Sequence, residues 1–170
     1  KGSDYLWAVY RRWTALDPQA MTPLRQSELA VDDWHALAAD DGGADPFPDP
    51  ALRVALANAY GRTLADLDIT AADLVAVAAT AIHPMRALLT LLDHVGGYRE
   101  DPLRKKSALL GVILRQRPEP LLPAAVDDDA PPIVDYHVQR SCLRTGAVVI
   151  DDADLLARVA ARRLLDPSEE

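Results

Sequence analysis

Apolar residues recur at helical spacing in one segment after another, and a proline, a glycine or a polar joint separates these segments. The clearest is TAADLVAVAATAI, where Thr70 is placed to cap a helix and Asp73 falls in the first turn. Similar spacing predicts helices over residues 3–16, 31–39, 51–60, 85–94, 103–116, 136–145 and 152–165. With at most a short strand at residues 147–150, the pattern predicts an all-α fold, in which residues 1–170 form one multi-helix domain.

The composition supports helices and an intracellular setting. Hydrophobic residues make up 49% of the chain but aromatic residues only 5%, so the core must be built mainly from alanine, leucine and valine. The single cysteine, Cys142, excludes an internal disulfide and suits a reducing cytosol. No apolar run approaches the roughly 20 residues of a membrane span, so we expect a soluble, cytoplasmic protein. Both ends are abrupt, which favours the middle of a longer chain.

The charge is acidic overall but unevenly distributed. A net charge of -8 argues against sequence-independent binding to duplex nucleic acid, because such binding neutralises phosphates with basic side chains. Residues 1–98 hold 7 basic and 13 acidic side chains, whereas residues 99–163 hold 11 and 10. The second half is therefore the better place for a small anionic ligand or a short reach of nucleic-acid backbone.

Polar chemistry is concentrated in PPIVDYHVQRSCLRTG, residues 131–146. Asp135 stands where extended chain becomes helix, so its local role is the N-cap, and the helix dipole there favours an anionic carboxylate. Tyr136, Arg140 and Arg144 share one face of the following helix, either as a solvated flank or as a phosphate clamp. His137 lies beside them, while Val138, Cys142 and Leu143 are expected to be core.

Lys105 and Lys106 open the preceding helix, and Lys106 leans toward its apolar stripe. A half-buried lysine can act as a nucleophile or pair with a carboxylate, or it can cover apolar neighbours while its amine stays in water. Trp7 belongs with the expected core, but a tryptophan can also line a pocket and stack on a planar base. The four histidines lack metal-binding spacing, so no metal or other cofactor is expected.

These segments together resemble the queuosine salvage N-glycosylase family. RKKSALLGVIL, DYHVQRSCLRTG and DDADLL follow one another in the order in which that family carries a KRAQILV-like helix, a DYRVPQ motif and an SDDLL-like helix. GSDYLWAVYRRWTALD and LAVDDWHALAADD are similar to its earlier helices, so the likeness spans most of the chain. The family is related to the helix-hairpin-helix DNA glycosylases, and the archaeal oxoguanine glycosylase also pairs a lysine at a helix start with a later aspartate.

The resemblance implies an N-glycosylase site. Asp135 matches the catalytic aspartate, and Lys106 or Lys105 matches the basic position on the preceding helix. We predict that Tyr136, His137, Arg140 and Trp7 bind the substrate.

The expected activity is an N-glycoside hydrolase that releases a modified purine or deazapurine base such as queuine. Its substrate, and expected partner, is a free nucleoside or nucleoside 5′-monophosphate, and no membrane partner is expected. One alternative is a DNA glycosylase for a damaged or hypermodified base. Another is a non-catalytic helical scaffold that binds nucleic acid or protein. The sequence leaves the oligomeric state open.

Overall fold

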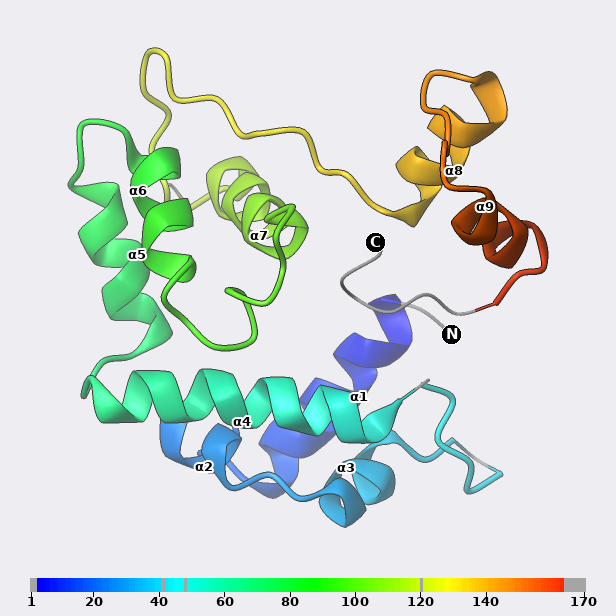
Figure 1. Cartoon of the computed structure of the whole chain (residues 1–170). Helices are drawn as coiled ribbons and strands as arrows, with labels where there is room; N and C mark the ends of the chain where they lie inside the picture. Colours follow the sequence, from blue (N-terminus) through cyan, green and yellow to red (C-terminus); the bar gives the residue numbers. More distant parts are fainter. Residues whose placement is uncertain (1–2, 41, 48, 120, 164–170) are drawn as a thin grey trace. The chain divides into compact units, whose positions relative to one another are not determined.

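The helices of the chain belong to two units, Lys1–Ile133 and Val134–Glu170. The computed structural model describes residues 3–40, 42–47, 49–119 and 121–163. These residues form nine helices and no strand, so the predicted all-α class is confirmed. Unit 1 contains α1 (Ser3–Leu16), α2 (Pro23–Ser27), α3 (Val31–Ala38), α4 (Pro50–Asp66), α5 (Ala71–Ala79), α6 (Pro84–Leu92) and α7 (Lys105–Gln116), and unit 2 contains α8 (Tyr136–Thr145) and α9 (Ala153–Ala160) (Figure 1). The prediction of one domain over the whole chain stays a prediction.

The first core of unit 1 lies among α1, α3 and α4. It buries Val9 and Trp13 of α1, Trp34 of α3 and Val54 of α4. The Trp34 indole nitrogen donates a hydrogen bond to the Asp45 carboxylate at 3.1 Å, so the one polar atom of this ring is satisfied. Leu37 and Ala38 of α3 are buried together with Trp34, so this helix turns one apolar face to the core.

The second core of unit 1 lies among α4, α5, α6 and α7, and α4 reaches both cores because it also contributes the fully buried Leu64. The start of α5 follows the sequence prediction closely. Thr70 Oγ1 accepts a hydrogen bond from the Asp73 nitrogen at 3.2 Å, and the Asp73 carboxylate accepts one from the Thr70 nitrogen at 2.8 Å. This capping box fixes the first turn of α5, whose residues Ala71, Ala72 and Leu74 line a pocket.

Gly61 is not the helix stop that its residue type suggests. The predicted helix was expected to end at Tyr60, but α4 continues through Gly61 to Asp66. A Cβ atom on Gly61 would come within 2.5 Å of the Pro23 carbonyl oxygen and nearer still to the Ser27 nitrogen. The glycine therefore serves the close approach of α2 and α4 and not the end of a helix.

The chain between α7 and α8 is a proline-rich connector. Its residues 121–132 return to the start of α6. Asp128 of this connector is 2% exposed, and its carboxylate accepts hydrogen bonds from the Met85 nitrogen at 2.7 Å and the Arg86 nitrogen at 3.0 Å. Arg115 of α7 completes the arrangement through a 2.8 Å ion pair with the same carboxylate. One side chain of the connector thus caps α6 and binds α7.

The described part of unit 2 contains two short helices, and both ends of α8 and the start of α9 agree closely with the sequence prediction. Asp135 caps α8, Gly146 ends it with a left-handed φ of 71°, and Asp152 caps α9. Residues 147–150 form no strand, and α8 buries none of its residues, so the expected core role of Val138, Cys142 and Leu143 is wrong. The helix predicted to reach residue 165 ends at Ala160, and residues 164 and 165 lie outside the described part.

Within the described ranges, no helix has both the length and the apolar character that crossing a bilayer requires.

Candidate functional site

Asp135 is held in place by the first turn of α8. Its backbone is extended, with φ -121° and ψ 178°, so the chain turns into the helix immediately after it. One carboxylate oxygen, Oδ1, accepts hydrogen bonds from the His137 nitrogen at 3.0 Å and the Val138 nitrogen at 3.1 Å. Backbone donors and the helix dipole both favour the anionic form of a carboxylate in such a place. The predicted cap is confirmed, and the side chain is half-buried.

Three of the predicted substrate-binding residues gather on the turn that Asp135 caps. The Tyr136 and His137 rings lie 3.9 Å apart between centroids, and the Arg140 guanidinium stands 5.7 Å from the Tyr136 centroid. Arg140 Nη2 donates to His137 Nδ1 at 3.1 Å, which assigns the acceptor role to that nitrogen. A carboxylate, a phenol, an imidazole and a guanidinium therefore share one exposed helix turn.

The two lysines have different local surroundings. Lys105 is the first residue of α7 and is half-buried. Lys106 is also half-buried, its backbone nitrogen donates to the Asp101 carboxylate at 2.8 Å, and its amine donates to the carbonyl oxygen of Gly97. This bond anchors Lys106 to the loop after α6. The catalytic roles predicted for both lysines stay predictions.

Trp7 lies on α1 and is 65% exposed, so it does not belong to the core in which Trp13 and Trp34 are buried. The expectation of a core role for Trp7 is therefore wrong. An exposed indole presents a large flat surface on which a planar base can stack. Its predicted part in substrate binding stays a prediction.

Comparisons with protein-family models, with curated proteins and with solved structures found no match. Among the residues that the structure describes, no group of three or more histidine, cysteine, aspartate or glutamate side chains is placed to hold a metal ion.

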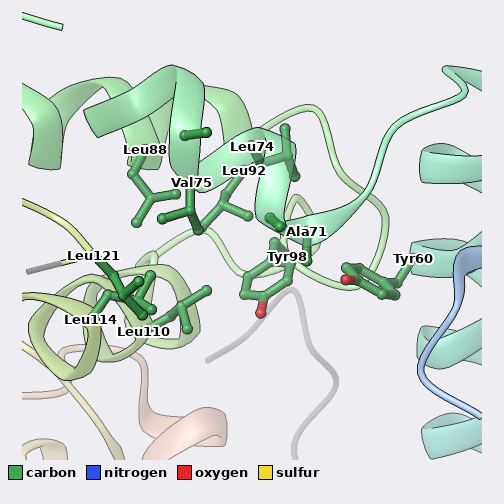
Figure 2. Close-up of a pocket in the computed structure, with 12 residues that line it drawn as sticks. Tyr60, Ala71, Leu74, Val75, Leu88, Leu92, Tyr98, Leu110, Leu114 and Leu121 are labelled. Atoms are coloured by element: carbon green, nitrogen blue, oxygen red, sulfur yellow. The ribbon is translucent and has the colours of Figure 1, made fainter. Parts of the chain in front are cut away.

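A second candidate site is a pocket of about 560 Å³ inside unit 1 (Figure 2). Ten of its lining residues are alanine, valine or leucine, and the other two are tyrosines. They come from α4, α5, α6, α7 and the loops that follow α6 and α7: Tyr60, Ala71, Ala72, Leu74, Val75, Ala76, Leu88, Leu92, Tyr98, Leu110, Leu114 and Leu121. The capped first turn of α5 and the buried face of α6 thus form much of the wall.

Tyr60 and Tyr98 supply the polar atoms of the pocket wall. Their rings meet edge to face with centroids 6.4 Å apart, and Figure 2 shows the Tyr60 hydroxyl directed toward Tyr98. Burial raises the pKa of Tyr60 to about 12, with the neighbouring Tyr98 contributing, and burial also raises the pKa of Tyr98. Both hydroxyls therefore stay protonated and uncharged near neutral pH.

Sequence reasoning missed this pocket. In the sequence Tyr60 is only the last residue of a predicted helix, and no role is predicted for Tyr98. The available signal was only that these are two of the five tyrosines in a chain with 5% aromatic residues. No local spacing links them, because one lies on α4 and the other lies in the loop after α6.

Proposed function

We propose that the chain is an N-glycoside hydrolase that releases a modified purine or deazapurine base, such as queuine, from a nucleoside or its 5′-monophosphate. The observation that carries the proposal is the first turn of α8, where Asp135 stands beside Tyr136, His137 and Arg140. The resemblance to the queuosine salvage N-glycosylase family supports the same carboxylate. The proposal uses residues of unit 2 alone.

The reaction needs an anionic group near the sugar. As the bond between C1′ and the base nitrogen breaks, the sugar develops the positive charge of an oxocarbenium ion. The Asp135 carboxylate stabilises this charge and accepts a proton from the water whose oxygen forms the new bond to C1′. That proton then replaces the sugar on the departing base.

The neighbouring side chains fit the rest of the substrate. The exposed ring of Tyr136 offers a surface on which the base can stack. The Arg140 guanidinium can donate to a 5′-phosphate through nitrogens other than the one that binds His137. Because Tyr136 and His137 both contact Arg140, this cation is positioned before a ligand arrives.

Base release tests the proposal directly. The protein is incubated with queuosine, with its 5′-monophosphate and with base-modified DNA, and the released base is measured by chromatography. We expect release from the nucleoside or the monophosphate, and Asp135→Asn should slow it by at least about 100-fold. Asparagine is also a good N-cap, so α8 should be retained in this variant.

Asp152→Asn is the matched control. Asp152 Oδ1 accepts hydrogen bonds from the nitrogens of Asp154 and Leu155 at 2.8 and 2.9 Å, the same cap geometry as at Asp135. Its substitution should leave base release unchanged. An undiminished rate in Asp135→Asn, or an equal loss in both variants, would show that the Asp135 carboxylate has no chemical role. Release from DNA alone would favour the DNA glycosylase, and no release by the folded protein would favour the scaffold.

A further inference from the structure

The pocket of unit 1 has the size of a small-molecule site and an unusually apolar wall. Its volume of about 560 Å³ lies within the roughly 300–1,000 Å³ that such sites occupy. None of its lining residues carries a charge. Leu88 and Leu92 at its wall are buried, whereas Leu121 is 42% exposed. An occupant that covered Leu121 would remove apolar surface from water, which is favourable.

The two tyrosine hydroxyls give the pocket its only side-chain hydrogen-bonding groups. Neither hydroxyl has a hydrogen-bond partner among the described residues, although both rings are held in the wall by their mutual contact. A ligand atom that can accept or donate a hydrogen bond would therefore find a partner there. Such groups fix the orientation of a ligand in an otherwise apolar site.

The same wall argues against the nucleoside of the proposed function. A purine-like base carries several donors and acceptors around its edge, and each one buried without a partner costs free energy. Two hydroxyls cannot satisfy that edge. A charged ligand fits still less well, because no lining side chain can balance its charge.

We propose that this pocket binds an uncharged, largely apolar small molecule, with one hydrogen-bonding atom directed at the hydroxyls of Tyr60 and Tyr98. The inference is independent of the proposed hydrolase, since it uses only residues of unit 1. An absence of base release by the folded protein would leave the pocket assignment standing, and failure of the pocket to bind a probe would leave the proposed hydrolase standing.

A fluorescent probe pair tests the class of ligand. N-phenyl-1-naphthylamine is uncharged, and 1-anilinonaphthalene-8-sulfonate has the same ring system with a sulfonate added. We expect the uncharged probe to bind the full chain at one site, and the sulfonate to bind at least about tenfold more weakly. No binding of the uncharged probe, or equal binding of both, would overturn the proposal.

Two adjacent positions on α5 locate the site. Ala76 lines the pocket, and Val77 does not, although both side chains are exposed. Ala76→Trp should weaken binding of the uncharged probe by at least about tenfold because the indole fills the pocket, whereas Val77→Trp should leave it within about twofold. Thermal unfolding of both variants confirms that they fold. Equal affinity in folded Ala76→Trp and wild type would place the probe elsewhere and overturn the assignment.

A second ligand pair tests the hydroxyls. 2-acetylnaphthalene and 2-ethylnaphthalene have similar shapes, but only the first has a carbonyl acceptor, and each can compete with the probe. In the variant with Tyr60→Phe and Tyr98→Phe, the acetyl compound should lose about fivefold in competition relative to the ethyl compound. An unchanged ratio would show that the hydroxyls do not bind the ligand.

Discussion

Asp128 is a buried carboxylate that joins three segments of unit 1. It lies in the connector, caps α6 through the backbone nitrogens of Met85 and Arg86, and pairs with Arg115 of α7. Arg115 also donates to the Asp128 carbonyl oxygen at 2.7 Å. A buried charge is tolerated when its hydrogen bonds and its counter-charge are present together, and here both are.

Asp128→Asn should lower the free energy of unfolding by about 3 kcal/mol, because it leaves the Arg115 charge without its partner. The side chains of the pair are only 1% and 18% exposed, so water can replace little of the lost interaction. Urea unfolding followed by circular dichroism measures the change. Asp129→Asn, at the exposed neighbouring position, is the control. Its free energy of unfolding should stay within about 0.5 kcal/mol of the wild-type value.

The same carboxylate should make stability depend on pH. Burial alone would raise the pKa of Asp128, but the hydrogen bonds from Arg86, Met85 and Arg115 outweigh it and hold the pKa below its usual value. Its contribution is therefore fully present above the unfolded pKa of about 4 and is lost as pH falls through the folded value. The stability difference between wild type and Asp128→Asn should narrow on acidification. A constant difference between pH 7 and pH 3 would contradict this.

The residues of the candidate site differ in how far sequence could predict them. The cap at Asp135 and the grouping of Tyr136, His137 and Arg140 are local, because helix periodicity alone places them on one turn. The bond from Lys106 to Gly97 joins different elements, and so does the meeting of Tyr60 with Tyr98. Both contacts depend on how the helices pack against one another, and the residue types alone do not predict that packing.

At the scale of elements, Gly61 and Gly111 show two ways in which a glycine can serve a helix. Both lie inside helices, where alanine would be intrinsically better by about 1 kcal/mol. A Cβ atom on Gly61 would meet backbone atoms of α2, which cannot move alone. A Cβ atom on Gly111 would come within 2.5 Å of the Met85 sulfur, which belongs to a flexible side chain.

Gly61→Ala should therefore destabilise the protein by about 2 kcal/mol, since α2 must shift to make room. Gly111→Ala should stay within about 1 kcal/mol of wild type, because Met85 can change its rotamer and the helix gains propensity. Thermal or urea unfolding of the two variants measures the difference. Equal losses of unfolding free energy in the two variants would contradict this, because they would mean that α2 shifts at no greater cost than the Met85 side chain.

Helix starts were predicted better than helix ends. The caps at Thr70 and Asp135 act through bonds to their own first turns, and the sequence shows the whole motif. The end of α4 was misplaced because a glycine inside a helix and a glycine after it have the same local signature. What distinguishes the two cases here is the close packing of α2 against Gly61, which the local sequence does not show.

For the whole molecule, the two units differ in what stabilises them. Unit 1 contains both hydrophobic cores, and Ile133 still packs against the second of them. The described residues of unit 2 include no buried side chain. Helical spacing predicted all-α elements in both units, but spacing does not reveal which elements share a core. That depends on packing between distant segments.

A fragment of residues 1–133 should fold alone, with a thermal midpoint within about 3 °C of the full chain, because its cores are complete. A fragment of residues 134–170 should show little helix, since chains below about 40 residues rarely fold without added constraints. Circular dichroism of the two fragments measures both outcomes. A cooperative transition in the shorter fragment, or an unfolded longer one, would contradict this division of stability.

Because Asp128 caps α6 from a later part of the chain, we expect this contact to affect when unit 1 folds during synthesis. Met85 and Asp128 are separated by 43 positions, and the ribosome makes α6 first. Closing a loop of that length costs chain entropy that only the finished contacts offset. We therefore expect α6 to leave the ribosome with an uncapped start and unit 1 to reach its native state only after the connector has emerged. Until then the apolar helix faces of unit 1 are exposed to water, and exposed apolar surface makes a nascent chain prone to aggregation.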